Sequence, residues 1–466
     1  MKIKNICCIG AGFVGGPTMA VIALKCPSLK ITVVDIDKNK IDLWNGDLNK
    51  LPVYEPGLKK IISQVRGINL FFSTEINKEI EKSEMIFMAV NTPTKKEGEG
   101  KGYAADLKYV EKCAKQIAKV SNSDKIIIEK STLPVRTAEK IKEILDTYKT
   151  KDINFEVLSN PEFLAEGTAI NDLFKSDRVL IGGDDTKSGK AAIDKLVDIY
   201  KNWIPSDRIL TTNIWSSELT KLVSNAMLAQ RISSINSVSA ICEKTGADID
   251  EVSNATGMDS RIGPSFLKAS VGFGGSCFKK DILNLVYISR HYGLNEVADY
   301  WEAVVKINNY QTERIGEAII SSLDLEEMNP ITTILGWAFK KDTNDSRESA
   351  SIYLANKLLK NNITLHIYDP RVTEYIIRKD IVNVLKETNV SEKEIELIMT
   401  RVKVFYNPYD TIGDSSVIAV CTEWDEFIEY DWKKIFKIMK YPKCIFDGRN
   451  ILDKENLESI GFKTFF

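Results

Sequence analysis

A cysteine at the end of a glycine-rich loop is the first residue in this chain that could do chemistry. Cys277 follows Gly272-Phe-Gly-Gly-Ser276, and the residues from Asp281 onward are typical of a helix. A thiol at a helix N-terminus lies at the positive end of the helix dipole, and Lys279 and Lys280 add positive charge, so the reactive thiolate is favoured. The glycines would let the backbone approach a ligand closely. The alternative interpretation is a buried, inert cysteine after a tight turn.

A second group of candidate residues lies on a long predicted helix. The stretch from Ile209 to Thr245 contains no glycine or proline, and its apolar residues recur at helical spacing from near Trp215 onward. Glu218, Lys221 and Asn225 lie near one face of such a helix. The last two are four residues apart, so they can point at the same spot. The alternative for Lys221 is a solvated lysine on a helix surface.

Histidine is scarce, which limits the kinds of site that the chain can build. The sequence has two, His291 at a predicted helix end and His366 in a predicted strand, and we interpret both as structural. A zinc site of His and Cys, or a Ser-His-Asp triad, therefore fits the chain poorly, and we expect no metal. Acid–base chemistry must fall to Lys, Glu, Asp or Cys side chains.

The composition is that of a globular protein with several domains. The chain has 466 residues, of which 44% are hydrophobic and 27% charged, and this length favours about three domains. A net charge of −2 gives no global basic field for nucleic acid or an anionic membrane, so we expect neither partner. An anionic small-molecule substrate would instead need a local cluster of Lys and Arg.

The cysteines and the apolar segments predict a cytoplasmic protein. Eight cysteines occur without CxxC spacing, and no signal peptide precedes them, which favours reduced thiols. The longest apolar runs, such as Met85–Val90, are far too short to span a bilayer. We therefore expect a cytoplasmic location.

The N-terminal segment carries a dinucleotide-binding pattern in its full context. A predicted strand, Lys4–Ile9, runs into Gly10-Ala-Gly-Phe-Val-Gly15, and a helix from about Val14 to Lys25 and a second strand, Lys30–Asp35, follow. The glycines allow the turn and the close approach to a pyrophosphate, which the helix N-terminus stabilises. Asp35 should accept hydrogen bonds from ribose hydroxyls and would repel a 2′-phosphate. NAD is therefore favoured over NADP.

Three further strands end in loops that could line a ligand site. The predicted strands are Met85–Val90, Lys125–Glu129 and Phe155–Ser159, and their loops begin at Asn91, Lys130 and Asn160. In a doubly wound sheet the loops after the strand C-termini face the ligand crevice, so these loops are candidate walls. Taken alone, each proline-containing loop is merely a turn.

A second series of strands begins near Pro330 and has no GxGxxG. Strands are predicted after Pro330, at Ile363–Tyr368, after Ser416 and from Cys444, and the polar loops at their ends could hold a different nucleotide. The two α/β halves, with the long helix between them, predict an α/β fold.

Six motifs together resemble one enzyme family across nearly the whole chain. They are Val90-Asn-Thr-Pro-Thr94, Ser159-Asn-Pro-Glu-Phe-Leu-Ala-Glu-Gly-Thr168, Trp215-Ser-Ser-Glu-Leu219, Phe266-Leu-Lys-Ala-Ser-Val-Gly-Phe-Gly-Gly-Ser-Cys-Phe278, Phe339-Lys-Lys-Asp-Thr343 and Phe446-Asp-Gly-Arg449. The chain resembles the UDP-glucose 6-dehydrogenases within the UDP-glucose/GDP-mannose dehydrogenase family. The cysteine loop and the NPEFLAEG segment look most like the eukaryotic members.

The resemblance implies a domain plan and a reaction. The plan is an α/β fold with two Rossmann-like doubly wound domains joined by a central helical region built on the long helix. Residues 1–214 would form an N-terminal NAD domain, 215–325 a central helical dimerisation region that carries the cysteine loop, and 326–466 a C-terminal UDP-binding domain. UDP-glucose would be oxidised twice at C6 to UDP-glucuronate, with NAD as the cofactor, through a thiohemiacetal and a thioester on Cys277. The other catalytic residues implied are Lys221 and Asn225 for the oxyanion, Asp281 to hold Lys221 or position water, and Glu162 and Thr132 to act on a catalytic water.

The same resemblance implies which residues bind the substrate and the cofactor. Those for the substrate are Phe163, Leu164, Glu166, Arg261, Phe266, Lys268, Phe273, Gly274, Phe339, Lys340 and Arg449. Those for the cofactor are Gly10, Gly12, Phe13, Val14, Gly15, Asp35, Lys40, Val90, Thr92, Ser131, Thr132, Glu166, Lys280 and Arg347. Arg261 would reach the sugar of a neighbouring subunit, so we expect self-association into a dimer or a hexamer built from dimers. Lys279 receives no role.

Two other functions remain open from the sequence. One is a sister dehydrogenase acting on GDP-mannose or a UDP-N-acetyl sugar, although sister enzymes vary in the segment that corresponds to residues 266–278. The other is a catalytically inactive NAD-binding scaffold that senses redox state or holds a partner. The presence of Cys277, Lys221 and Asn225 argues against a scaffold, because an inactive relative has no need of all three.

Overall fold

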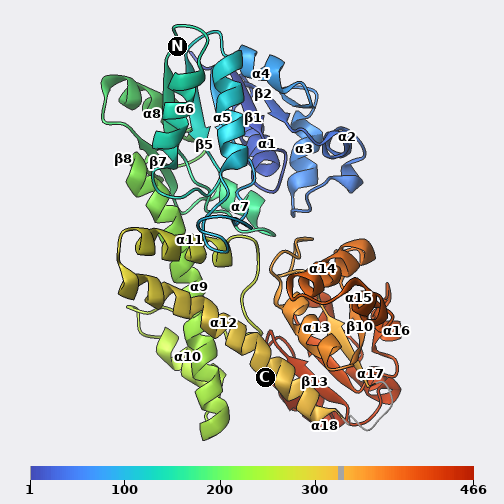
Figure 1. Ribbon diagram of the computed structural model, residues 1–466. Coiled ribbons are helices and arrows are strands. Elements are labelled where there is room, and N and C mark those ends of the chain that lie inside the picture. The colour runs from blue at the N-terminus through green and yellow to red at the C-terminus, as the bar shows by residue number, and fades with distance from the viewer. Residues whose placement is uncertain (1, 324–329, 466) are drawn as a thin grey trace. The chain divides into compact units, whose positions relative to one another are not determined.

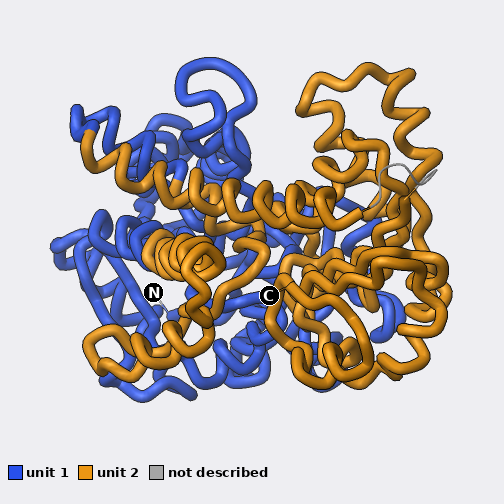
Figure 2. The backbone as a smooth tube through the Cα atoms, turned by 90° about the horizontal axis from the view of Figure 1, so that it is seen from below, with its two compact units in different colours: residues 1–225, 283–295 blue, residues 226–282, 296–466 orange. Residues whose placement is uncertain are grey.

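The chain folds into two units, which Figure 2 shows in separate colours. The computed structural model describes residues 2–323 and 330–465. Unit 1 comprises Met1–Asn225 and Leu283–Asn295, and unit 2 comprises Ala226–Ile282 and Glu296–Phe466. The boundary predicted between residues 325 and 326 lies outside the described residues.

Unit 1 contains an eight-stranded sheet in the order β3-β2-β1-β4-β5-β6-β7-β8. Figure 1 labels β1, β2, β5, β7 and β8 of this sheet. Neighbouring strands are parallel except β6 and β7, which pair antiparallel. The strands are β1 Asn5–Ile9, β2 Lys30–Val34, β3 Leu70–Ser73, β4 Met85–Met88, β5 Lys125–Glu129, β6 Phe155–Ser159, β7 Val179–Gly183 and β8 Ile209–Asn213. Since β1, β4, β5 and β6 run in one direction, the loops after them share one edge of the sheet.

Helices cover both faces of this sheet. Alternate residues of β1 show it: Ile6 and Cys8 belong to one hydrophobic cluster, and Cys7 and Ile9 belong to the other. Burial on both faces is typical of a parallel sheet between helices. The helices of this sheet are α1 Gly15–Lys25, α2 Lys38–Asn45, α3 Leu58–Val65, α4 Ile76–Lys82, α5 Lys108–Val120, α6 Thr137–Tyr148, α7 Ala169–Phe174 and α8 Lys187–Tyr200, with short 3₁₀ turns η1 Leu48–Lys50 and η2 Ser206–Arg208.

A 32-residue helix, α9, runs from Ile214 to Thr245, close to the predicted limits. It ends before Gly246, whose φ of +78° lies in the left-handed region that favours glycine after a helix. The helix starts in unit 1 and continues into unit 2. The other central helices are α10 Ile249–Gly257, α11 Phe278–His291 and α12 Asn295–Ser322.

The C-terminal part of unit 2 contains a six-stranded parallel sheet in the order β11-β10-β9-β12-β13-β14. Its strands are β9 Ile331–Leu335, β10 Thr364–Tyr368, β11 Val402–Val404, β12 Val417–Val420, β13 Cys444–Asp447 and β14 Lys463–Phe465. Its helices are α13 Ala350–Lys360, α14 Glu374–Glu387, α15 Glu392–Met399, α16 Pro408–Ile412, α17 Trp432–Ile438 and α18 Lys454–Ile460, with a 3₁₀ turn η3 Asp425–Phe427.

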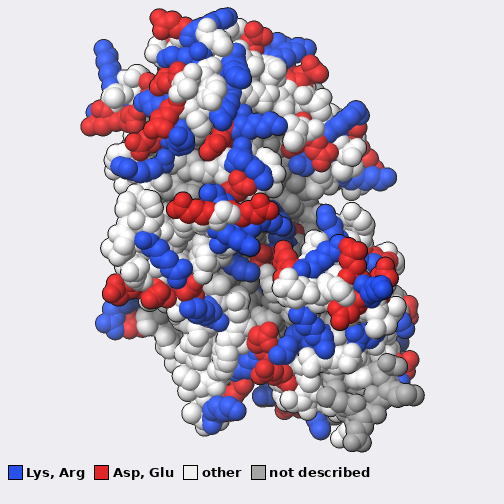
Figure 3. Space-filling view, viewed as in Figure 1, with Lys and Arg blue, Asp and Glu red and all other residues white. Residues whose placement is uncertain are grey.

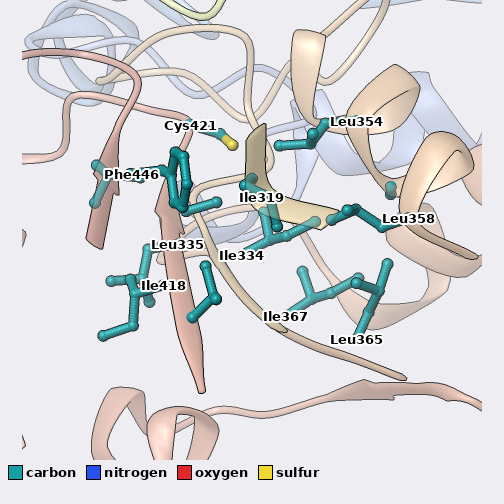
Figure 4. Packing of buried hydrophobic residues seen from close by; sticks show 14 of the residues in the cluster. Ile319, Ile334, Leu335, Leu354, Leu358, Leu365, Ile367, Ile418, Cys421 and Phe446 are labelled. Carbon is teal, nitrogen blue, oxygen red and sulfur yellow. The ribbon is translucent and has the colours of Figure 1, made fainter. Parts of the chain in front are cut away.

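The core of this sheet also takes in the end of α12. Ile334 from β9 and Ile418 from β12 pack in one cluster with Leu354 and Leu358 from α13 (Figure 4). Ile319 from α12 belongs to the same cluster and is fully buried. Within unit 2, helix α12 is therefore joined to the C-terminal sheet by hydrophobic packing.

The predicted fold class is confirmed, with small differences at strand ends. β5 and β6 have the predicted limits, whereas β4 ends at Met88 instead of Val90, because the chain turns into its loop there. His366 lies buried in β10 with its Nδ1 2.9 Å from the carbonyl oxygen of Thr411, which fits a structural role.

Charged side chains of both signs are interspersed on the face shown in Figure 3. No helix within residues 2–323 and 330–465 has the length and apolarity needed to cross a membrane. Over the same ranges, no three His, Cys, Asp or Glu side chains form a group that could hold a metal ion.

Candidate active site

A buried ion pair forms the centre of the candidate site in unit 1. The Lys221 ammonium lies 3.1 Å from a carboxylate oxygen of Glu162, and the two side chains are only 4% and 6% exposed. Lys221 comes from α9, and Glu162 from the loop that follows β6. Burying an ion pair adds little stability, because the desolvation penalty offsets the Coulomb attraction. A pair in such a position is therefore a candidate for function.

Asn225 extends the same face of α9. Its side-chain oxygen accepts a hydrogen bond of 3.4 Å from the Lys221 ammonium, one helical turn earlier, and the residue is buried. The four-residue spacing predicted this juxtaposition. The ammonium and the amide can stabilise an oxyanion, while the Glu162 carboxylate can accept a proton.

A second buried lysine adjoins the ion pair. The Lys130 ammonium donates to Asn160 Oδ1 at 3.1 Å and to the Tyr200 hydroxyl at 3.4 Å. Burial lowers the pKa of Lys130 to about 8; the charge of Glu162 opposes this shift and the charge of Lys221 adds to it. The protonation of Lys130 is thus coupled to both members of the ion pair.

The loops after β4 and β5 are tied together at the carboxyl edge of the sheet. The Ser131 hydroxyl donates to the carbonyl of Val90 at 2.6 Å, and the Thr92 hydroxyl donates to the carbonyl of Thr132 at 3.1 Å. Thr92 and Thr132 are buried. Four residues that the sequence predicted for cofactor binding therefore lie next to one another.

The Phe163 ring, predicted to contact the sugar, lies against two cations. The Arg178 guanidinium is 3.9 Å from the ring centroid, and the Lys221 ammonium is 5.4 Å from it. The Arg178 guanidinium also donates to the Ser224 hydroxyl of α9 at 3.2 Å. Phe163 is thus held beside the face of α9 that carries the ion pair.

The buried carboxylate of Glu55 anchors the rest of this loop. Its two oxygens accept hydrogen bonds from the N–H groups of Gly167 at 2.7 Å and Ala169 at 3.2 Å. Leu164 and Glu166, both predicted for ligand binding, are half-buried in the segment that Glu55 anchors.

The glycine-rich turn between β1 and α1 fits a dinucleotide. Gly10 has φ +115°, and a Cβ there would lie 2.2 Å from the carbonyl oxygen of Ala89. At Gly15 a Cβ would lie 2.0 Å from the Gly10 oxygen, whereas at Gly12 nothing lies within 4 Å of the Cβ position. The open space at Gly12 suits the close approach of the NAD pyrophosphate. Phe13-Val14 leads from this space into α1.

Asp35 lies directly after β2, where a ribose-binding acid is expected. One oxygen accepts from the Ala11 N–H at 2.9 Å and from the Lys40 ammonium at 3.0 Å, and the other accepts from the Asp37 N–H at 3.0 Å. Burial would raise the pKa of Asp35, but these donors hold it below its ordinary value. The anionic carboxylate would repel a 2′-phosphate.

In unit 2, helix α12 holds the cysteine loop. Phe273 exchanges two hydrogen bonds with Asn308, of 2.8 Å from its N–H and 3.1 Å to its carbonyl. The Thr312 hydroxyl donates to the Val271 carbonyl at 2.9 Å. Cys277 is half-buried and immediately precedes α11, so the thiol lies at a helix N-terminus as predicted.

The same loop packs on the segment between β9 and α13. A Cβ at Gly274 would lie 2.6 Å from the Glu348 carbonyl oxygen and 2.9 Å from Phe339 Cβ, so only glycine fits there. The Gly275 N–H donates to the Arg347 carbonyl at 3.0 Å. Phe339 and Arg347, both predicted for ligand binding, therefore lie beside the cysteine loop.

Lys279, which the sequence analysis left without a role, adds an ionic tie to the same segment. Its ammonium lies 2.8 Å from the Glu348 carboxylate and 3.0 Å from the Tyr353 hydroxyl, which also donates to Glu348. Burial would lower the pKa of Lys279, but Glu348 and Tyr353 together raise it. Lys279 thus secures the start of α11 against α13.

Two further predicted residues, Lys280 and Asp281, lie in the first turn of α11. Asp281 is fully buried, and the Lys280 ammonium lies 3.8 Å from its carboxylate. The positive end of the helix dipole stabilises a carboxylate in this position.

Arg449 lies at the carboxyl edge of the C-terminal sheet, just after β13. Its guanidinium donates to the carbonyls of Cys421 at 2.6 Å and Phe339 at 2.8 Å and lies 3.3 Å from the Glu423 carboxylate. Lys340 follows Phe339 and is half-buried. A fixed cation at this edge suits a diphosphate.

Three predicted substrate residues lie outside these groups. Arg261, Phe266 and Lys268 are exposed on the segment after α10. The Arg261 side chain is 88% exposed and lies 2.6 Å from the Asp259 carboxylate. Their contribution to a site stays a prediction.

Sequence reasoning missed several residues of the site. Lys130 was named only as the start of a candidate loop and received no role, although a charged residue directly after strand β5 was a signal. No sequence pattern indicated Tyr200 or Arg178, since their partners are distant in sequence and only the fold brings them together.

Three family models match the chain in sequence. All belong to the UDP-glucose/GDP-mannose dehydrogenase family: the NAD binding domain matches residues 4–204, the central domain matches 215–310 and the UDP binding domain matches 333–454. The NAD-binding model spans the glycine-rich turn, and the central model spans Lys221 and Cys277.

Known proteins resemble the chain over nearly its full length. UDP-glucose 6-dehydrogenase of Drosophila melanogaster is 54% identical over 98% of this chain and 95% of its own. UDP-glucose 6-dehydrogenase 1 of Glycine max is 54% identical over 99% of this chain and 96% of its own. The structure of a UDP-glucose dehydrogenase from the hyperthermophilic archaeon Pyrobaculum islandicum superimposes with a TM-score of 0.81. It covers 98% of this chain and 96% of its own, at 27% sequence identity. The chain belongs to the UDP-glucose/GDP-mannose dehydrogenase family.

Proposed function

We propose that this protein is a UDP-glucose 6-dehydrogenase, which oxidises UDP-glucose at C6 to UDP-glucuronate and reduces two NAD. One observation carries the choice of substrate: enzymes of that name match nearly the whole chain at 54% identity. The proposal assigns residues 1–214 to the NAD domain, 215–325 to the central helical region with the cysteine loop, and 326–466 to the UDP-binding domain.

Cys277 is the nucleophile in this proposal. NAD, when bound, accepts the hydride that leaves C6 in each of the two oxidations. The thiol adds to the aldehyde carbon and its proton passes to the aldehyde oxygen, which gives a thiohemiacetal; the second oxidation converts this into a thioester. Attack by water breaks the carbon–sulfur bond and releases the carboxylate product and the thiol. The location of Cys277 before α11 supports this role, because the helix dipole favours the thiolate.

The buried polar residues of unit 1 supply charge and proton transfer. Lys221 and Asn225 stabilise the negative charge that develops on the C6 oxygen, which their hydrogen bond on one face of α9 supports. Glu162 and Thr132 act on the water that hydrolyses the thioester, and the low exposure of Glu162 supports a role as general base. Asp281 positions water.

The remaining predicted residues bind the two ligands. UDP-glucose contacts Phe163, Leu164, Glu166, Phe266, Lys268, Phe273, Gly274, Phe339, Lys340 and Arg449. NAD contacts the turn from Gly10 to Gly15, Asp35, Lys40, Val90, Thr92, Ser131, Thr132, Glu166, Lys280 and Arg347. The open space at Gly12 and the anionic Asp35 support NAD over NADP.

We also infer that the enzyme acts in the cytoplasm as a dimer or as a hexamer built from dimers, in which Arg261 completes a neighbouring subunit's site. The high exposure of Arg261 leaves its side chain accessible to a second subunit. The eight cysteines of the sequence lack CxxC spacing, which supports a reducing compartment.

Comparing nucleotide sugars as substrates tests the proposal. We expect NADH formation from UDP-glucose with kcat/KM at least roughly 100-fold above that from GDP-mannose or UDP-N-acetylglucosamine, because buried polar groups left unpaired by a wrong sugar penalise it strongly. Cys277→Ala serves as the control for contaminating activity. Preference for another sugar would show a sister dehydrogenase, and no NADH from any sugar would favour the inactive scaffold.

A further inference from the structure

Two carboxyl groups outside the proposed catalytic set face each other in the interior of unit 1. Glu129 is the last residue of β5 and Glu218 lies in the first part of α9; they are 2% and 3% exposed. Each is three residues before a residue of the proposed site, since Thr132 follows Glu129 and Lys221 follows Glu218. A buried carboxyl group needs a partner, because desolvation strongly disfavours its charge.

The Glu218 carboxylate has its partners at the N-terminus of α6. One oxygen accepts a hydrogen bond of 2.7 Å from the Arg136 N–H, and the other accepts one of 2.8 Å from the Ala138 N–H. Arg136 precedes α6 with a left-handed φ of 74°. Main-chain donors at the positive end of a helix stabilise the anionic form of Glu218.

Glu129 has a different environment. Neither of its oxygens receives a hydrogen bond from an N–H or hydroxyl donor of the part of the chain that the structure describes. Its carboxyl group instead lies within hydrogen-bonding reach of the carboxyl group of Glu218. Two carboxylates have no proton between them to share, so a hydrogen bond between these groups requires one of the pair to be a carboxylic acid. Because Glu218 accepts from two N–H groups, the proton belongs on Glu129.

The described cations on the elements packed around the pair have other partners. The strand neighbours of Glu129 in β4 and β6 are the uncharged Met88 and Ser159. On the adjacent residue, the Lys130 ammonium donates to Asn160 and Tyr200. On α6, the Arg136 side chain lies over Trp215, 5.2 Å from its ring centroid, and 3.6 Å from the Glu139 carboxylate. On α9, Lys221 pairs with Glu162.

We infer that Glu129 is a positioning residue of the proposed dehydrogenase, whose neutral carboxylic acid donates a hydrogen bond to Glu218 and so fixes the Thr132 loop, α6 and the Lys221 face of α9 in one arrangement. The inference rests on the proposed function for its effect on turnover. Neither residue touches the substrate; they act through Thr132 and Lys221.

The direction of the pKa shifts agrees with a shared proton. Burial raises the pKa of Glu129 well above its ordinary value, with Glu218 adding to the shift, and burial raises the pKa of Glu218 to about 7 although its N–H donors oppose this. A raised carboxyl pKa means that the pair's contribution to stability is fully present below about pH 4.5, the ordinary value, and is lost as pH rises through the raised values. Alkaline pH should therefore disrupt the arrangement.

Two substitutions at one position test the inference. The amide of Glu129→Gln donates the same hydrogen bond but cannot lose a proton, so kcat near pH 7 should stay within about twofold of the wild type. Glu129→Met removes the donor and should lower kcat by about 100-fold, because small displacements of catalytic groups have effects of this size. The UDP-glucose KM should change by less than about threefold in both variants, since neither contacts the substrate. Glu139→Gln, the same change on the exposed side of α6, is the matched control.

The pH profile separates a positioning proton from simple packing. The ratio of kcat for Glu129→Gln to kcat for the wild type should rise at alkaline pH, because only the wild type loses the shared proton. Other groups that titrate at alkaline pH affect both proteins equally, so their effects cancel in this ratio. Loss of turnover in Glu129→Gln as severe as in Glu129→Met, or a ratio that is flat with pH, would overturn the inference.

The failure of the proposed function gives a different result. If the wild type forms no NADH from any nucleotide sugar, thermal unfolding of the wild type and of Glu129→Gln replaces turnover as the readout. The wild type should then lose stability relative to Glu129→Gln as pH rises above 7, and a constant difference would contradict the shared proton. The same readout serves if Glu129→Met does not fold.

Discussion

The buried ion pair between Lys221 and Glu162 contributes little to the stability of the fold. Both are almost completely buried, so the loss of hydration offsets most of their attraction. Removal of one partner would leave an unpaired charge in the interior, which typically costs about 3–5 kcal/mol. Variants at these positions therefore need a stability measurement beside each rate, and Cys277 offers a cleaner test because it is only half-buried.

Cys277→Ser should lower steady-state NADH formation by at least about 100-fold, since a serine hydroxyl is far less acidic than a thiol and adds poorly to the aldehyde. Binding of UDP-glucose, measured by calorimetry, should remain within a few-fold, because the thiol supplies chemistry more than affinity. Cys26→Ala, which removes a buried thiol at the end of α1, is the control and should keep its activity. Near-normal turnover by Cys277→Ser would return Cys277 to an inert role.

The lowered pKa of Lys130 predicts that the free energy of unfolding depends on pH. Its pKa is lowered to about 8, whereas the unfolded chain has the ordinary value of 10.5. Between these values the unfolded state binds more protons, so this residue makes the protein more stable as pH rises from 8 to 10.5, by up to about 3 kcal/mol. Urea unfolding of the wild type and of Lys130→Met should show that this rise is missing in the variant. Parallel pH curves for the two proteins would contradict the assignment.

At the scale of elements, the βαβ unit and α9 were predictable because each carries a local signal. The glycine pattern fixed the turn between β1 and α1, and the absence of glycine and proline fixed the length of α9. The antiparallel pairing of β6 and β7 was not predictable, since it depends on which strand edges meet and not on a local pattern. The tie between Glu55 and Gly167 has the same origin, because 112 residues separate them.

The turn before α1 offers a matched pair of glycine substitutions. Gly12→Val places its side chain in open space, so stability should change by less than about 1 kcal/mol while NAD binding weakens by at least about tenfold. At Gly16 a Cβ would lie 2.4 Å from the Trp44 ring, so Gly16→Val should lower the melting temperature instead. Thermal unfolding and NAD titration of both variants check the pair; full NAD affinity in Gly12→Val would place the pyrophosphate elsewhere.

For the molecule as a whole, the fold class predicted from the sequence is confirmed, and the roles predicted for the catalytic residues stay predictions. The sequence could not predict the polar contacts that support these residues. Lys130, Tyr200 and Asn160 meet only because β5, α8 and the loop after β6 converge in the folded sheet. The tie between Lys279 and Glu348 likewise depends on how the cysteine loop packs on the segment before α13. Contacts of this kind carry no periodic signal in the sequence.

Assembly can be tested by complementation between two inactive variants. If Arg261 completes a neighbouring site, Arg261→Ala and Cys277→Ala should each be inactive alone. After subunit exchange, mixed oligomers should contain some sites with both residues intact and regain partial activity. Exchange is verified with differently tagged subunits, and Arg261→Ala mixed with itself is the control. No recovery in verified mixed oligomers would place Arg261 in its own subunit's site or outside catalysis.

In the proposed mechanism, one enzyme carries an alcohol through a thioester on Cys277 to a carboxylate. The most direct measurement is the ratio of NADH formed to UDP-glucose consumed, with NADH followed by absorbance and the nucleotide sugars by chromatography. A cysteine that retains the aldehyde commits each substrate to both oxidations. We expect two NADH and one UDP-glucuronate for every UDP-glucose consumed. A ratio near one, with free aldehyde as the product, would contradict the proposed mechanism.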